Sequence, residues 1–361
     1  MSNTVNIPIG AQHISLLEPL RFIFKAENEK IVDVEADFGY VHRGYEKACE
    51  TNFKFKQISY AVSRVCGLCS ITHASAYTFA IEKVMGIEVP LRAKYLRMLT
   101  FELDRIHSHM LCLSHTAESA GFEALFMRIM KDRESVMEIQ ELLTGNRIHF
   151  DFTTIGGVNR DVDEALKSEI EKKLYNFRKK IDEITDLFLK NYSLSLRYKG
   201  VGKLTSDEAL ELSAVGPLLR ATGIASDTRE ETTELPYGEI GFKIATESGG
   251  DIHSRNIVRL REIDNSLDMI EQILANLPDG EIDVKVKGMP EGEGIARVEA
   301  PRGELCYYIK GVKKQYLDRV RIKTPTYSNI PSMIEVFKGE EYASAPPILA
   351  SLDPCMSCTA K

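Results

Sequence analysis

The chain has 361 residues, 43% hydrophobic and 27% charged, which are ordinary values for a globular protein with a sizeable core. Its net charge is −7 at pH 7 and it has no arm rich in lysine and arginine, so these totals exclude non-specific nucleic-acid binding. There is no secretory signal pattern and no uninterrupted apolar run of about 18 residues, so we expect no membrane-spanning segment in the chain.

The first 55 residues have the pattern of strands and turns. The apolar segments Phe22–Phe24 and Ile31–Val34 flank a polar triplet at residues 27–29. Two such runs separated by a short polar segment are typical of a β-hairpin. We therefore predict a small sheet in the N-terminal part.

Residues 56–280 contain four stretches with helical periodicity. In each stretch apolar residues recur in steps of three and four, which places them along one helix face. The stretches cover residues 96–113, 125–143, 166–188 and 260–277. Narrow apolar stripes on helices of about five turns favour antiparallel packing in a bundle.

After residue 280 the pattern returns to strand-like alternation, for example in Ile282–Val286. We predict one α+β domain with a core of bundled long helices at residues 56–280. Small β-sheets are expected in the N-terminal part, 1–55, and in the C-terminal part, 281–361.

Two cysteine pairs stand out because most of the chain lies between them. One pair is Cys66 and Cys69, and the other is Cys355 and Cys358. Two intervening residues let both sulfurs of a pair face one metal ion, whereas a zinc ribbon separates its pairs by only about 15–20 residues. A site that uses both pairs must be closed by the whole fold, so we predict a buried metal centre. The spacing alone also allows a four-thiolate zinc site that only holds the fold.

Residues near the pairs are candidates for supporting roles. On a helix that starts at the first pair, His73 would project back over the metal and could hydrogen-bond a thiolate. Asp353 places a carboxyl group beside the second pair.

Other histidines and cysteines are interpreted as structural. Three histidines on one predicted helix have spacings of two and six residues, which do not stack on one face. Three further cysteines are scattered and are interpreted as buried apolar residues. These residues are His107, His109 and His115, and Cys49, Cys112 and Cys306.

Taken together, the motifs resemble the large subunit of [NiFe] hydrogenases, within them the membrane-associated, energy-converting group. That group is related to the 49 kDa-type subunit of respiratory complex I. The resemblance covers nearly the whole chain and rests on the segments Gly10–His13, His42–Lys47, Arg64–Cys69, Gly216–Arg220, Glu299–Leu305 and Asp353–Cys358. The complex I relative shares the second of these segments but has lost the four-thiolate site, so the cysteines favour a hydrogenase.

The resemblance implies a nickel–iron centre held by all four thiolates. Cys66 and Cys355 would be terminal ligands of nickel. Cys69 and Cys358 would bridge nickel to an iron that carries carbon monoxide and cyanide. Soft thiolates suit such a centre. The implied reaction interconverts protons and H₂.

The resemblance also implies roles for several side chains around the centre. Glu46 would be the first proton-relay group beyond a terminal cysteine, if burial raises its pKa towards neutrality. Arg302 would reach over the metals with Asp353 as its hydrogen-bond partner. Candidates for the base in H₂ cleavage are Arg302, Asp353, a terminal thiolate and Glu46.

Partners are implied because three remaining cysteines cannot supply the four thiolates of an ordinary iron–sulfur cluster. The resemblance suggests a small subunit with a proximal [4Fe–4S] cluster, further electron-transfer and membrane subunits, and ferredoxin. The chain would then be peripheral on the cytoplasmic side of the cell membrane, and His13 would belong to a coupling loop that faces the membrane arm. Two alternatives are a soluble hydrogenase with a nicotinamide or deazaflavin partner, and a structural subunit of a complex I-like respiratory complex with a four-cysteine zinc site.

Overall fold

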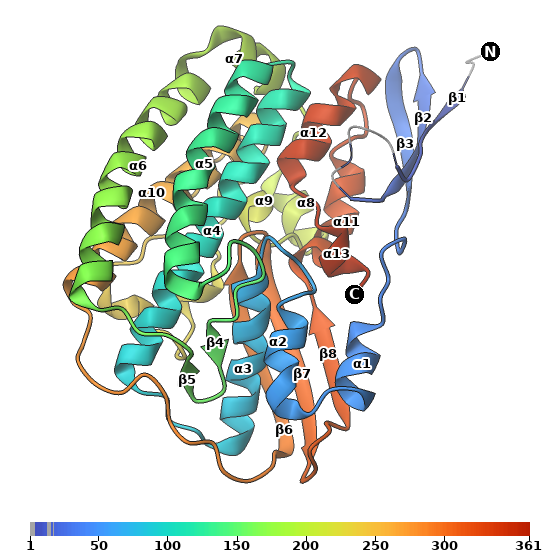
Figure 1. Cartoon of the computed structure of the whole chain (residues 1–361). Coiled ribbons are helices and arrows are strands. Elements are labelled where there is room, and N and C mark those ends of the chain that lie inside the picture. Colours follow the sequence, from blue (N-terminus) through green and yellow to red (C-terminus); the bar gives the residue numbers. More distant parts are fainter. Residues whose placement is uncertain (1–3, 13–15, 17) are drawn as a thin grey trace.

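The computed structural model describes residues 4–12, 16 and 18–361. Long helices form a central bundle, one three-stranded sheet lies at its lower end, and the N-terminal sheet stands at the opposite corner (Figure 1). The predicted α+β architecture is therefore confirmed. His13, the residue predicted to lie in a coupling loop, falls outside the described residues.

Four long helices form the bundle, as the periodicity predicts. They are α4 (Leu91–Ser119), α5 (Glu123–Thr144), α6 (Glu164–Lys190) and α10 (Ile252–Ala275). In α6 the buried residues recur from Ile170 to Phe188 in steps of three and four, and Asp163 caps the first turn. α4 is buried along nearly its whole length, because α5, α10 and α12 (Ala345–Leu352) pack around it. The polar residues of α4 must therefore find partners inside the protein.

The C-terminal sheet positions the helix that carries the first cysteine pair. Its antiparallel strands are β6 (Glu291–Ala300), β7 (Gly303–Val312) and β8 (Arg319–Lys323), in that order. α3 (Ser70–Met85) packs on β6 and β7. Gly294 permits this close approach, since a Cβ there would lie 2.8 Å from the carbonyl oxygen of Ala80.

The N-terminal sheet consists of β1 (Val5–Ile9), β2 (Arg21–Glu27) and β3 (Lys30–Asp37). β2 and β3 form the predicted hairpin. Backbone hydrogen bonds join β3 to the segment before α12, because Ile31 N donates to Glu340 O at 2.8 Å and Gly339 N donates to Ile31 O at 2.7 Å. This sheet is thus held against the segment that leads to the second cysteine pair.

The segment Ile282–Val286 is not a strand, so this prediction was wrong. The segment lies beside two strands of two residues each, β4 (Thr153–Thr154) and β5 (Gly157–Val158), and an isolated bridge joins Asp283 to Gly157. Strands this short offer too few backbone partners for the alternating segment to form a strand of its own.

The remaining helices are short. They are α1 (Tyr45–Thr51), α2 (Phe55–Val62), α7 (Tyr192–Tyr198), α8 (Ser206–Glu211), α9 (Pro217–Arg220), α11 (Pro325–Glu335) and α13 (Met356–Thr359), with 3₁₀ turns η1 (Thr228–Glu230), η2 (Tyr237–Glu239) and η3 (Tyr342–Ser344). Within the described part of the chain, no helix is long and apolar enough to cross a membrane. One cluster of buried hydrophobic residues extends from Ile9 to Met356, while the division into one domain of three parts stays a prediction.

Candidate metal centre

The four cysteines of the two pairs meet in the interior. Cys355 Sγ lies 3.4 Å from Cys66 Sγ and 3.1 Å from Cys358 Sγ, and Cys69 Sγ lies 3.5 Å from Cys358 Sγ. All four side chains are buried and none forms a disulfide. The predicted convergence of the two motifs is therefore confirmed.

The first pair occupies the turn that starts α3. Cys69 is the N-cap residue of this helix, and the backbone N–H of Leu68 donates to Cys66 Sγ at 3.3 Å. Free backbone N–H groups and the helix dipole favour negative charge at a helix N-terminus. The start of α3 therefore favours a thiolate at Cys66, whose sulfur accepts from the backbone N–H of Leu68.

The second pair occupies a turn between α12 and α13. Asp353 ends α12 in the left-handed conformation, with φ of 55°, which turns the chain before Cys355. Cys355 caps α13, and its Sγ accepts from the backbone N–H of Cys358 at 3.4 Å. Thr326 on α11 accepts from the backbone N–H of Cys355 at 3.2 Å. This turn is thereby fixed to α11.

Arg43 joins the two pairs. Its Nη2 donates to the carbonyl oxygen of Val65 at 2.8 Å and to that of Ser357 at 3.0 Å. Val65 precedes Cys66, and Ser357 lies between Cys355 and Cys358. One guanidinium therefore holds the backbones of both motifs in register, which gives Arg43 a structural role at the site.

A metal centre fits this donor set. Metal–sulfur bonds of about 2.3 Å place the sulfurs of a tetrahedral site ~3.8 Å apart, near the separations seen here, whereas a disulfide needs about 2 Å. Hydrogen bonds from Cys355, Cys358 and Cys69 lower the pKa of Cys66 well below its usual value although burial opposes this, and the charge of Arg302 acts in the same direction. Contacts among the sulfurs and burial raise the pKa of Cys69, Cys355 and Cys358, so without a cation the cluster does not favour four thiolates. Thiolate is the form that binds metal.

His73 lies against the cluster, where the sequence places it. Its Nε2 is 3.4 Å from Cys358 Sγ, and its Nδ1 is 2.7 Å from the hydroxyl of Tyr307. Burial lowers the pKa of His73 to about 4, so the ring is neutral at neutral pH. A neutral ring whose Nδ1 accepts from the tyrosine has its proton on Nε2, directed at the sulfur.

Arg302 and Asp353 form a buried pair beside the cysteines. Arg302 Nε donates to the carbonyl oxygen of Asp353 and Nη2 donates to its Oδ1, each at 2.8 Å. Burial opposes the charge of Arg302, but Asp353 and the cysteines raise its pKa, so the guanidinium stays charged. Asp353 Oδ2 is buried and has no partner among the described residues.

Glu46 is not brought to the cysteines by any described hydrogen bond or ion pair. Its carboxylate accepts from the backbone N–H of Ile322 and from Arg321, each at 2.9 Å. Glu18, which the sequence interpretation missed, instead accepts from the backbone N–H of Ser357 at 3.0 Å and from its hydroxyl. Local sequence shows only that Glu18 is an isolated carboxylate in the otherwise uncharged segment 14–20, and its contact with Ser357 arises from the tertiary fold.

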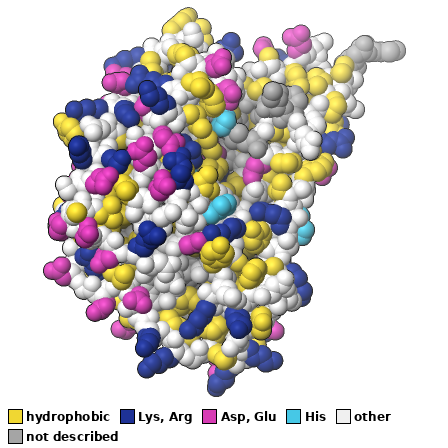
Figure 2. Space-filling view, viewed as in Figure 1, with side chains coloured by type: hydrophobic (Ala, Val, Ile, Leu, Met, Phe, Trp, Pro, Cys, Tyr) yellow, Lys and Arg dark blue, Asp and Glu magenta, His cyan; other side chains and the backbone are white. Residues whose placement is uncertain are grey.

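A cavity of about 400 Å³ lies next to the second pair. Its walls include Glu18, Cys112, His115, Asp353 and Met356, from the N-terminal segment, α4 and the cysteine turn. Figure 2 shows hydrophobic side chains along the seam between the bundle and the N-terminal sheet, whereas charged side chains cover the outer face of the bundle. Glu18 and Asp353 therefore line the same cavity, one from the N-terminal segment and the other from the cysteine turn.

The other histidines and cysteines lie where the structural interpretation expects them, with one difference. His107 and His109 are buried with Asp104 and Glu262 as partners, and His115 pairs with Glu118. Cys49 and Cys112 are buried, but Cys306 is only half-buried. Among the described residues, the group suited to hold a metal consists of cysteines of the two pairs.

Two family models match the chain. The model described as the 49 kDa subunit of respiratory-chain NADH dehydrogenase matches residues 120–289 and 284–361. The model described as nickel-dependent hydrogenase matches residues 43–117. Together they include both cysteine pairs.

Similar proteins include the membrane-bound hydrogenase subunit alpha of Pyrococcus furiosus, 36% identical over 98% of this chain and 87% of that protein. The carbon monoxide-induced hydrogenase of Rhodospirillum rubrum is 35% identical over 99% of each chain. An NADH-quinone oxidoreductase subunit of Carboxydothermus hydrogenoformans is 36% identical over 97% of this chain and 96% of that protein. A chain in the structure of a membrane-bound sulfane sulfur reductase, an archaeal respiratory membrane complex, superposes with a TM-score of 0.93, at 28% identity and 99% coverage of both chains. The chain therefore belongs to the family that unites the large subunits of nickel-dependent hydrogenases with the 49 kDa subunit of respiratory-chain NADH dehydrogenase.

Proposed function

We propose that this chain is the catalytic subunit of an energy-converting [NiFe] hydrogenase that interconverts protons and H₂. The meeting of four buried cysteine sulfurs beside a charged arginine carries the proposal. Sequence identity alone does not, because a hydrogenase and an NADH-quinone oxidoreductase subunit are both 36% identical to the chain.

The cysteines would hold the nickel–iron centre as the family resemblance implies. Cys66 and Cys355 would bind nickel alone, and Cys69 and Cys358 would bridge it to an iron with carbon monoxide and cyanide ligands. When bound, such a centre supplies the site at which two protons and two electrons combine. Arg302 would offset the negative charge of the thiolates, and His73 would fix the orientation of Cys358 through its Nε2 proton.

Proton transfer is assigned to Glu18 in preference to Glu46. The Glu18 carboxylate accepts a hydrogen bond from Ser357, which directly precedes Cys358, and it also lines the cavity. It can therefore carry protons between the cavity and the cysteine turn. Asp353 lines the same cavity, and its Oδ2 has no hydrogen-bond partner in the part of the chain that the structure describes, which makes it the second candidate. Glu46 is the third candidate, because Arg321 and the backbone N–H of Ile322 occupy its oxygens.

Electrons would reach the centre through a partner subunit. The three cysteines outside the cluster lie apart on α1, α4 and β7 and cannot together bind an iron–sulfur cluster. A small subunit with a proximal [4Fe–4S] cluster, fed by ferredoxin, meets this need. Relatives named as a membrane-bound hydrogenase and an archaeal respiratory membrane complex support a peripheral position on membrane subunits. As the family resemblance implies, those subunits would couple the reaction to ion movement. We place the chain on the cytoplasmic side.

A second candidate is a structural subunit of a complex I-like respiratory complex whose cysteines hold zinc. It is considered because NADH-quinone oxidoreductase subunits are also similar to the chain, although a relative named as a hydrogenase matches at equal or higher identity. The decisive test is an infrared spectrum of the natively purified complex, together with its metal content. Bands of carbon monoxide and cyanide with stoichiometric nickel would support the hydrogenase. Zinc without such bands, in a matured sample, would leave the structural subunit.

A further inference from the structure

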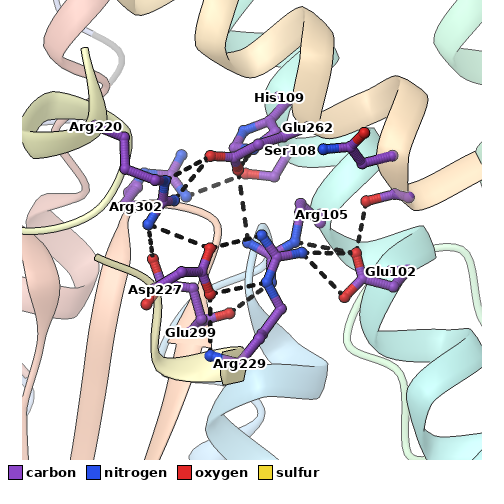
Figure 3. A network of polar contacts seen from close by, with 12 residues as sticks. Glu102, Arg105, Ser108, His109, Arg220, Asp227, Arg229, Glu262, Glu299 and Arg302 are labelled. Carbon is purple, nitrogen blue, oxygen red and sulfur yellow. Dashed lines mark hydrogen bonds and ion pairs between the residues drawn. The ribbon is translucent and has the colours of Figure 1, made fainter. Parts of the chain in front are cut away.

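A network of buried charged side chains lies near Arg302, the arginine that pairs with Asp353 beside the cysteines (Figure 3). Its members are Arg105, Arg220, Arg229, Glu102, Asp227, Glu262 and Glu299, each at most 5% exposed. They come from α4, α9, α10, β6 and the η1 segment, so the network joins most elements around the site. None of the hydrogen bonds or ion pairs described for these seven side chains reaches a cysteine.

The network is connected to the metal centre through a tight hairpin. Strands β6 and β7 pair up to Ala300 and Gly303, which leaves Pro301 and Arg302 as the turn. Glu299 projects from the end of β6 into the network, whereas Arg302 projects from the turn onto Asp353. Only two residues separate them, so a displacement of Glu299 must displace Arg302.

Three elements hold Glu299. Its Oε1 accepts from Arg220 Nη1 on α9 at 2.7 Å, and its Oε2 accepts from the backbone N–H of Thr228 on η1 at 3.2 Å. Its backbone oxygen accepts from Arg105 Nη2 on α4 at 2.7 Å. The strand end therefore has little freedom to shift.

The residue that directly precedes α9 also packs against the Pro301–Arg302 turn. Gly216, just before Pro217, adopts φ of 70° and packs so tightly that a Cβ would collide with the carbonyl oxygen of Arg302. Four residues later Arg220 bonds to Glu299. The short helix thus fixes both the backbone of the turn and the side chain at its base.

We propose that Glu299 and Arg220 are positioning residues that hold the guanidinium of Arg302 over the metal centre. This inference rests on the proposed hydrogenase function. Neither residue touches the metal ligands, so their effect is transmitted through the Pro301–Arg302 turn. A misplacement of a reacting group's partner by about 1 Å can cost on the order of 10²-fold in rate.

The experiment compares Glu299→Gln, Arg302→Lys and the double variant in the natively purified complex. We expect Glu299→Gln to keep its nickel, to shift the carbon monoxide and cyanide bands in the same direction as Arg302→Lys, and to lower H₂ evolution roughly ten- to a hundredfold. Because Glu299 acts through Arg302, the double variant should be no slower than Arg302→Lys alone. If Glu299→Gln does not fold, Arg220→Lys, which keeps the charge but loses the forked contact, is measured in its place.

Glu82→Gln is the matched control. Glu82 is also buried and pairs with Arg97 through two hydrogen bonds of 2.6 and 2.9 Å, and no described contact joins it to the Pro301–Arg302 turn. In the Glu82→Gln variant the carbon monoxide and cyanide bands should stay at the wild-type positions. Unshifted bands in Glu299→Gln would overturn this inference and leave the proposed function intact. The same holds if the losses of H₂ evolution in the two single variants multiply in the double variant. Absence of bands from the wild-type complex would overturn the proposed function, and this inference with it.

Discussion

Two buried polar clusters are connected in this protein by the Pro301–Arg302 turn. In the charged network, guanidinium and carboxylate groups of opposite sign bond to one another, as Arg229 does to Asp227 at 2.7 Å. In the cysteine cluster, four groups of the same kind face one another at 3.1–3.5 Å, and the nearby charge of Arg302 is already paired with Asp353. A cluster that contains both signs can be stable by itself, whereas four converging thiolates require a cation.

The largest effect should come from removing a cysteine of the cluster. Cys355→Ser replaces a soft thiolate by a hydroxyl, so nickel content and H₂ evolution should fall to background. Metal analysis of the purified complex measures this. Cys112→Ser is the control, because Cys112 is buried on α4 but lies outside the cluster, and it should retain nickel. Full nickel occupancy in Cys355→Ser would mean that Cys355 is not a metal ligand and that the cysteine cluster does not need the cation.

Breaking the charged network should lower the free energy of unfolding. Glu262→Gln leaves Arg220 without one of its buried carboxylate partners, so the free energy of unfolding should drop by about 3–5 kcal/mol. Denaturant unfolding measures this. Arg178, whose three carboxylate partners are exposed, provides the control, since Arg178→Gln should cost about 1 kcal/mol or less. Equal costs for the two variants would show that burial does not distinguish the network from surface pairs.

The two glutamates near the cysteines should differ in activity. Glu18→Gln removes the carboxylate that touches Ser357, so H₂ evolution should fall by about 10²-fold or more with nickel unchanged. Glu46→Gln removes a pair with Arg321 at the surface and should have a much smaller effect. H₂ evolution at saturating reductant ranks the two. The reverse ranking would restore Glu46 as the proton relay.

The most gradual effect is a pH dependence of stability that comes from His109, which contacts the charged network through Glu262. Burial lowers the pKa of His109 from 6.5 to about 4, although Glu262 opposes this. The unfolded chain binds the proton first, so the stabilisation is complete above pH 6.5 and is lost as the pH falls from 6.5 to about 4. The slope is about 1.4 kcal/mol per pH unit. His109→Gln should remove this contribution, and an unchanged slope would argue against it.

Local patterns predicted a large part of this structure. The four bundle helices and the β2–β3 hairpin follow from periodicity, and the cysteine spacing indicated that both pairs share one buried site. The segment Ile282–Val286 failed because its strand-like alternation has no long partner strand, which is a property of the tertiary fold. Glu18 was missed for a similar reason, since its role depends on contact with Ser357, 339 positions away in sequence. The network was also beyond local patterns, because charged residues of five separate elements carry no shared periodicity.

The distance along the chain between Cys66 and Cys355, 289 positions, has a kinetic consequence. Contacts between such remote segments form late in folding, because the entropy of closing the loop is lost before the contact is gained. The turn before α3 can form early and locally, but the sulfurs of the second pair arrive only when α11 and α12 have docked. During biosynthesis the two thiol pairs therefore exist apart for some time, each exposed to oxidation or to the wrong ion. We expect correct loading to depend on factors that keep both pairs reduced until the fold closes.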